Sequence, residues 1–264
     1  MNQCPDILER LQSQNKDVVR EAAFAAGEER CLEAIPHLTR LLRDSQLGVQ
    51  EAAELTLRKM GGEEAIQALI PLLWEEEASV RNVAMDILRD VADQDLERIL
   101  ELLQAEDADI RIFAADILGC VESVMAVRPL CESLLGDPEV NVRYQAAVSL
   151  GELGHREAVK CLNKALQDEE WVQFAVIEAL KKIRDDSSVS YLIQALGKGS
   201  DLVDSIIIDA LGDIGNIKAV PLLLQSMDAA PVPLRNRIVQ ALVKMLGSQT
   251  LNLLNAAERE KFRH

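Results

Sequence analysis

Apolar and polar positions along the chain form a recurring pattern of paired short helices. The clearest copy spans Asp137 to Asp168, where apolar residues at helical spacing form two runs separated by a Gly-rich turn. The first run is Val142, Ala146, Ala147 and Leu150, and the second is Ala158, Val159, Leu162 and Leu166. This pattern predicts a helix-turn-helix hairpin. One hairpin cannot bury its own apolar faces, so we expect neighbours of the same kind.

Further copies of the hairpin follow at intervals of 30 to 32 residues. A small or branched apolar residue in each first helix marks them: Ala23, Ala53, Ala84, Ala114, Ala146, Val176, Ile207 and Ile238. The residue that opens each second helix keeps the same spacing: Ala34, Ala65, Asp95, Ala126, Ala158, Ser188, Ala219 and Thr250. Because an insertion would break one series or the other, their agreement predicts an all-α, right-handed α-solenoid of about eight helical hairpins.

The repeats define the expected domain organisation. A short helix over residues 1–16 is expected to cap the N-terminus, eight repeats of about 31 residues occupy 17–257, and 258–264 form a tail. No Ser- or Pro-rich linker interrupts the repeats, so residues 1–264 are predicted to form a single solenoid. Glycines after the first helices are predicted to be left-handed C-caps: Gly27, Gly61, Gly62, Gly119, Gly151, Gly212 and Gly247.

The motif V-R-x-x-A-A-x-x-L-G, followed by A-x-x-x-L-x-x-x-L-x-D, resembles HEAT repeats of the short bacterial type named after the phycobilisome lyases. The resemblance covers about residues 14 to 257. It implies a ladder in which acids and arginines of adjacent turns are hydrogen-bonded. The arginine is present as Arg20, Arg81, Arg111, Arg143 and Arg235, whereas Gln50, Gln173 and Asp204 replace it in repeats two, six and seven. The ladder would be broken there, leaving either a flexible segment or, as we favour, apolar packing that compensates.

Composition narrows the classes of partner. The net charge of −16 disfavours general nucleic-acid or anionic-membrane binding, since both need clustered Lys and Arg. No apolar run approaches the ~18 residues of a membrane span. The five cysteines are odd in number and include no C-x-x-C pair, so we expect a reducing, cytoplasmic location.

Catalytic and metal-binding signals are weak. The di-iron deoxyhypusine hydroxylases resemble this repeat but carry His-Glu pairs, and this sequence has none; its histidines, His37, His155 and His264, are far apart. We therefore predict no metal, no cofactor and no catalytic residue. Cys161, between Lys160 and Lys164, is expected to sit where it can face solvent, either as a reactive thiolate or, as we favour, as a small packed residue.

The second helices are expected to line the concave face, which repeat proteins commonly use for binding. Arg128, Lys160 and Lys164 form a basic island at the centre of an acidic molecule. The candidate protein-binding residues are Arg40, Gln67, Trp74, Glu97, Arg98, Glu101, Arg128, Glu132, Lys160, Lys164, Tyr191 and Gln194.

Two functions follow from these patterns. The leading one is a non-enzymatic scaffold or adaptor that binds another protein, or a peptide with an acidic segment, along the concave face. The alternative, implied by the resemblance alone, is a bilin lyase or chaperone-like factor that presents a tetrapyrrole to a target protein. The first helices of the last repeats stay strongly apolar, so we also expect the C-terminal end to meet either further repeats or, by self-association, a second copy of the chain.

Overall fold

The computed structural model describes residues 3–227 and 230–247, and within these ranges the chain consists of helices and turns without any strand. The chain divides into two compact units, residues 1–123 and 124–264, and each is described by itself. Repeated helical hairpins in both units confirm the predicted all-α solenoid fold. The handedness of the solenoid and its continuity as one domain stay predictions. The second helix of repeat eight, the tail and the proposed self-associating end lie outside the described residues.

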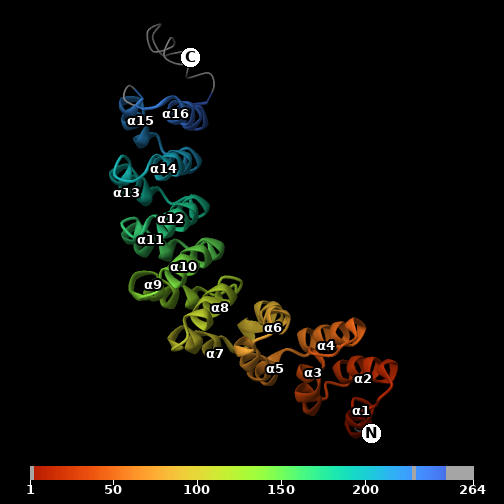
Figure 1. Ribbon diagram of the computed structural model, residues 1–264. Coiled ribbons are helices and arrows are strands. Elements are labelled where there is room, and N and C mark those ends of the chain that lie inside the picture. Colours follow the sequence, from red (N-terminus) through yellow and green to blue (C-terminus); the bar gives the residue numbers. More distant parts are fainter. Residues whose placement is uncertain (1–2, 228–229, 248–264) are drawn as a thin grey trace. The chain divides into compact units, whose positions relative to one another are not determined.

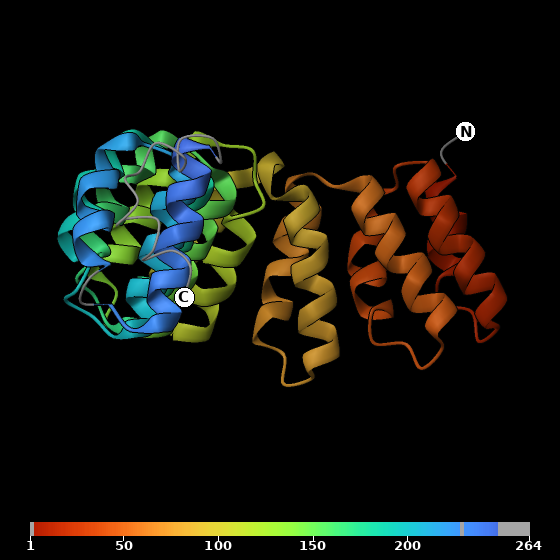
Figure 2. The same cartoon turned by 90° about the horizontal axis from the view of Figure 1, so that it is seen from above.

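The first unit contains three hairpins behind a short N-terminal helix. Helices α2, α4 and α6 lie side by side as the first helices of successive hairpins (Figures 1 and 2). Its elements are α1 (Cys4–Arg10), α2 (Lys16–Glu28), η1 (Leu32–Ala34), α3 (Ile35–Leu41), α4 (Leu47–Met60), α5 (Gly62–Leu69), η2 (Ile70–Trp74), α6 (Ala78–Val91), η3 (Ala92–Asp95), α7 (Leu96–Glu101), η4 (Leu102–Gln104) and α8 (Ala108–Leu118).

In the second unit, α10, α12, α14 and α16 form one layer, and α9, α11, α13 and α15 form the other (Figure 1). Each helix of the second layer follows a short 3-10 turn. The elements are η5 (Val124–Ala126), α9 (Val127–Gly136), α10 (Val140–Leu153), η6 (Arg156–Ala158), α11 (Val159–Ala165), α12 (Glu170–Ile183), η7 (Asp186–Ser188), α13 (Val189–Ala195), α14 (Asp201–Ile214), η8 (Ile217–Ala219), α15 (Val220–Ser226) and α16 (Val232–Leu246).

Small residues let the first helices of the second unit approach closely. Gly151 is buried within α10, and a Cβ atom added to it would lie 2.9 Å from the Cα atom of Ala179 in α12. Gly212 in α14 meets Ala241 in α16 at the same 2.9 Å. The predicted role of Gly151 and Gly212 as C-caps is therefore wrong: they are contact points between helices. Gly154, three residues after Gly151, ends α10 with a φ of +67°.

Gly27 repeats this arrangement in the first unit. It is buried within α2, and an added Cβ atom would lie 3.0 Å from a side-chain carbon of Thr56 in α4. Its predicted capping role is therefore also wrong. Gly61 and Gly247, by contrast, do end helices with positive φ, at +53° and +74°. Sequence position alone did not separate the two uses, because both place glycine near the end of a first helix.

The arginine positions bind backbone carbonyls at the end of the preceding hairpin. Arg143 donates to the carbonyl oxygens of Asp137 and Pro138, at 3.0 and 3.3 Å. Gln50 donates to the carbonyl of Asp44 at 2.7 Å, and Gln173 donates to that of Asp168 at 2.9 Å. The bond to the backbone carbonyl is therefore kept at repeats two and six, where the ladder of acids and arginines was predicted to be broken.

In repeat seven, the hydrogen bond between the first helix and the preceding turn runs in the opposite direction. Asp204, at the arginine position, accepts a hydrogen bond from the backbone N–H of Gly197 at 2.8 Å. The Asp204 side chain supplies an acceptor where the other repeats supply a donor, so the contact that ties each first helix to the preceding turn persists there too. Because this contact is kept, the replacement of arginine by Asp204 gives no reason to expect a flexible segment at repeat seven.

Ion pairs join successive first helices along their exposed edge. The pairs are Glu28–Lys59, Arg58–Asp90, Arg89–Asp116, Glu152–Lys182, Asp209–Arg237 and Asp213–Lys244. Pairs in such exposed positions contribute about 0–1 kcal/mol each. Apolar burial between the helices is therefore the main source of stability.

Candidate functional site

A groove runs between α9 and α11 in the second unit. It has a volume of about 590 Å³ and is lined by Val124, Val127, Arg128, Cys131, Leu135, Glu157, Lys160, Cys161 and Lys164. We call it the α9–α11 groove. Val124 and Leu135 leave 50% and 46% of their surface exposed, so the groove presents apolar side chains to solvent. Exposed apolar surface bordered by polar residues is typical of interaction sites.

Three cations border the α9–α11 groove. The side chain of Arg128 is 89% exposed and donates to Glu132, one helical turn further along α9, at 2.9 Å. Lys160 and Lys164 are exposed on α11, and neither makes an ion pair within the described residues. Arg128, Lys160 and Lys164 therefore lie around one groove, together with one acidic lining residue, Glu157, and Glu132 pairs with Arg128.

Cys131 and Cys161 form a disulfide within the groove lining, with their Cα atoms 5.7 Å apart. They are 30 residues apart, one repeat period, so equivalent positions of successive second helices are joined. Cys161 is 6% exposed. The favoured expectation of a small packed residue agrees with this burial. The position does not face solvent as expected, because the side chain turns towards α9. As a disulfide sulfur, it is also no thiolate nucleophile.

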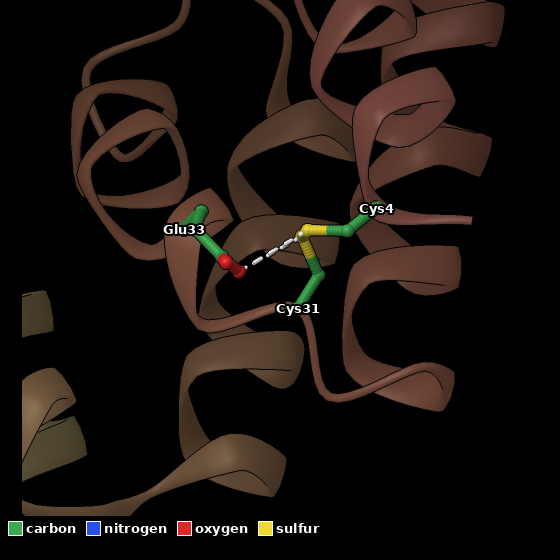
Figure 3. Close-up of a disulfide and its surroundings, with 3 residues drawn as sticks. All are labelled: Cys4, Cys31 and Glu33. Atoms are coloured by element: carbon green, nitrogen blue, oxygen red, sulfur yellow. Dashed lines mark hydrogen bonds between the residues drawn. A yellow bond between two sulfur atoms is a disulfide. The ribbon is translucent and has the colours of Figure 1, made fainter. Parts of the chain in front are cut away.

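A second disulfide joins Cys4 in α1 to Cys31, which precedes η1, with Cα atoms 5.5 Å apart (Figure 3). The Glu33 carboxylate points towards it, 3.3 Å from the Cys4 sulfur and 3.8 Å from the Cys31 sulfur. Within the described residues, these three are the one group that brings metal-type ligand atoms together. Soft metal ions bind thiolates, so sulfurs joined to each other do not serve as such ligands, and this pair acts as a cross-link.

The candidate residues of the first unit lie on its second helices. Arg40 on α3, Gln67 on α5, Trp74 at the end of η2, and Glu97 and Glu101 on α7 are exposed. Whether they and the residues of the second unit form one concave face stays a prediction.

Arg98, also on α7, differs from the other candidates of the first unit. It donates to Asp95 at 2.7 Å and to Glu63 at 2.9 Å. The hydrogen bond to Asp95, followed by the charges of Asp95 and Glu63, raises the pKa of Arg98. Its charge is already balanced within the fold, so Arg98 is a poorer contact for a partner than Lys160 or Lys164.

Tyr191 and Gln194 on α13 line a separate pocket on the other side of α11. The structure therefore divides the predicted central site of the second unit in two. Arg128, Lys160 and Lys164 belong to the α9–α11 groove, and Tyr191 and Gln194 belong to the second pocket.

An ion pair fixes the turn that follows α11. Arg143 binds Asp168 through two hydrogen bonds of 2.9 Å each, and both side chains are largely buried. Burial alone would raise the pKa of Asp168, but the hydrogen bonds from Arg143 and from the backbone N–H of Glu169 outweigh it and lower that pKa. Asp168 therefore stays ionised and holds the end of α11 against the start of α10.

The apolar groove residues were missed by sequence reasoning. Val124, Val127, Cys131 and Leu135 follow one another at intervals of three, four and four residues. This spacing places them on one helical face. Because the repeat motif already assigned apolar residues at this spacing to the core, the exposure of Val124 and Leu135 was not distinguishable from the burial of Val127. One disulfide had a signal in the sequence, since Cys131 and Cys161 lie one repeat period apart. The two disulfides do not fit the reducing location that was expected from the five cysteines.

Paired helices that stack at a constant repeat define an α-helical repeat protein of the solenoid class. The family model for HEAT repeats matches residues 4–89, 96–173, 127–206 and 168–243. The chain therefore belongs to the HEAT-repeat family. The matching family is a structural repeat rather than an enzyme family, and the finer phycobilisome-lyase type stays a prediction.

Two solved structures are similar to this chain. A crystal structure of an engineered protein is 20% identical, with a TM-score of 0.48 over 99% of this chain and 86% of that one. The X-ray structure of YibA from Escherichia coli is also 20% identical, with a TM-score of 0.49 over 92% of this chain and 94% of that one. Among curated proteins, no significant relative was found. None of the described helices combines the length and apolarity needed to cross a bilayer.

Proposed function

We propose that this protein is a non-enzymatic interaction scaffold that binds a partner protein or peptide through the α9–α11 groove. The partner contributes a segment that combines acidic and apolar side chains. The observation that supports this most is the joint presence in one groove of exposed apolar residues and of Lys160 and Lys164, whose charges are unpaired within the described residues.

The chemistry of the groove selects the character of the segment. An apolar side chain that enters between α9 and α11 would cover Val124 and Leu135, and burial of apolar surface contributes about 25 cal/mol per Å². Carboxylates of the same segment would meet Lys160 and Lys164. Such contacts at the border of an interface act mainly on specificity and on the association rate, and they weaken as salt rises. The alternative of a bilin lyase has no support from the family match, which is to HEAT repeats in general.

A displayed library of random 12-residue peptides tests the proposal. Peptides selected on the wild-type protein are expected to be rich in Asp and Glu together with Leu, Ile or Phe. Their dissociation constants would be measured by fluorescence anisotropy on the wild type and on the double variant Lys160→Glu, Lys164→Glu. We expect at least tenfold weaker binding by the variant, which is about 1.4 kcal/mol, and a loss of affinity with added salt in the wild type.

The matched control is the double variant Arg184→Glu, Lys218→Glu. Both residues are exposed and lie outside the groove, and the change in net charge is the same. This control should bind the selected peptides as the wild type does. Equal weakening in both variants would show that only the overall charge matters and would refute the groove as the site. Recovery of peptides without acidic residues would refute the proposed partner chemistry.

A further inference from the structure

A second pocket lies on the other side of α11, between that helix and α12, α13 and α14. Its volume is about 270 Å³. We call it the amide pocket because four primary amide side chains line it. Its lining residues are Asn163, Leu166, Gln167, Gln173, Ile177, Tyr191, Gln194, Ala195, Lys198, Gly199, Val203 and Ile207.

Asn163 is the unusual member of this lining. Its side chain is buried, with 7% of the residue exposed, and its Oδ1 atom has no hydrogen-bond partner within the described residues. A buried polar group without a partner is unfavourable, and such groups are rare in folded proteins. The neighbouring Gln173, by contrast, donates to the backbone carbonyl of Asp168 at 2.9 Å. The amide of Asn163 is therefore available to a molecule that enters the pocket.

The lining indicates which molecule that is. No carboxylate lines the pocket, and Lys198 is its one cation, so amide and hydroxyl groups dominate the polar surface. A primary amide offers both an acceptor oxygen and N–H donors, which match the N–H and C=O of a peptide group. Leu166, Ile177, Val203 and Ile207 add apolar surface for a side chain. The volume suits one or two residues of an extended chain rather than a folded surface.

We infer that the amide pocket binds the main chain of an extended peptide segment, with Asn163 hydrogen-bonded to one of its peptide groups. Gln194 and Tyr191 contact the same segment at the pocket entrance, where both are exposed. This inference rests on the proposed function, because the segment belongs to the partner that occupies the α9–α11 groove. Lys164 and Asn163 are adjacent on α11 but line different sites, so a single extended segment can cross this helix and contact both.

The decisive variant is Asn163→Leu, which keeps the approximate side-chain volume and removes the amide. This change removes a buried group without a partner, so it should stabilise the fold whatever the role of Asn163. The effect on peptide binding therefore decides whether Asn163 serves a ligand. We expect the melting temperature to rise by roughly 2–4 °C, the shift that removing one unsatisfied buried group gives in a chain of this size. We also expect the selected 12-residue peptides to bind at least tenfold more weakly.

Ser188→Ala is the matched control. The Ser188 hydroxyl is also fully buried and has no partner within the described residues, but it does not line the amide pocket. This variant should raise the melting temperature in the same way and leave peptide binding unchanged. Gln194→Ala is an exposed change in the pocket entrance, and it should weaken binding without affecting stability even if Asn163→Leu folds poorly.

The outcomes separate this inference from the proposed function. If peptide binding is lost on Lys160→Glu, Lys164→Glu but is unchanged by Asn163→Leu and Gln194→Ala, the groove stands and the amide pocket is refuted. If the reverse holds, the pocket stands and the groove is refuted. Lower stability of Asn163→Leu with unchanged binding would show that Asn163 serves the fold. Failure to recover any binding peptide would overturn both.

Discussion

Replacement of Gly151 by alanine tests the close approach of α10 to α12. In an isolated helix the change would be favourable, because alanine is preferred to glycine in a helix interior by about 1 kcal/mol. In this protein the new Cβ atom would lie 2.9 Å from both Cα and Cβ of Ala179. One of these atoms belongs to the backbone, so a side-chain rotation cannot relieve the contact and the two helices must separate.

The size of the effect follows from these two opposing contributions. Overpacking of a well-packed core costs about 1–3 kcal/mol, and contact with a backbone atom favours the upper part of that range. After subtraction of the helix preference, we expect Gly151→Ala to lower the free energy of unfolding by about 1–2 kcal/mol. For a chain of this length, that corresponds to a melting temperature lower by roughly 2–8 °C.

Two measurements check this prediction. Urea denaturation followed by circular dichroism gives the change in stability, and hydrogen exchange shows whether the amides of α10 and α12 lose more protection than those of α14 and α16. Gly136→Ala is the control, since Gly136 also lies in a helix but its added Cβ atom would meet nothing within 4 Å. If Gly151→Ala stabilises the protein as much as Gly136→Ala does, the two helices are further apart than described and the reasoning is refuted.

Two further predictions concern the disulfides and the acid range. A thiol reagent should label Cys120 alone in the unreduced protein, and labelling of all five cysteines without reductant would contradict the pairing. Reduction should lower the free energy of unfolding by about 3–4 kcal/mol for each disulfide, which is the chain-entropy value for links across 27 and 30 residues. Because the pKa of Asp168 is lowered by folding, its contribution is present above pH ~4 and is lost as the pH falls through the folded value. Asp168→Asn should therefore be less stable at pH 7, and its difference from the wild type should narrow as the pH falls below ~4 in urea titrations. A difference that stays constant with pH would exclude the ionised pair as the cause.

The repeat period alone predicted the helical hairpins, because apolar spacing and helix-ending residues agreed at the same positions in each copy. The role of the arginine position was harder to predict. What the fold requires there is a hydrogen bond to the end of the preceding hairpin, and Gln50 and Gln173 provide it as Arg143 does. Conversely, Gly151 looked like a helix cap because the sequence does not show how closely the next helix approaches.

The candidate site was predicted less completely. The basic residues Arg128, Lys160 and Lys164 were placed on second helices, and they line one groove in the structure. Asn163 had no signal, since a polar residue beside Lys164 on a second helix is ordinarily exposed. It lines a pocket together with residues of α13 and α14, which are two later helices of the chain. The burial of a side chain such as Asn163 depends on how several repeats pack in three dimensions, and the sequence of one repeat does not show it.

The disulfide between Cys131 and Cys161 also sets how the molecule responds to a stretching force. While the bond is intact, the residues between α9 and α11 cannot be drawn out when the two chain ends are pulled apart. A separation of 30 residues corresponds to a contour length of about 100 Å that remains hidden. Hairpins outside the segment between Cys131 and Cys161 would extend first. The segment itself would extend only after its disulfide is reduced. The oxidation state of this pair of cysteines therefore determines whether the segment between α9 and α11 contributes to the length of the protein under load.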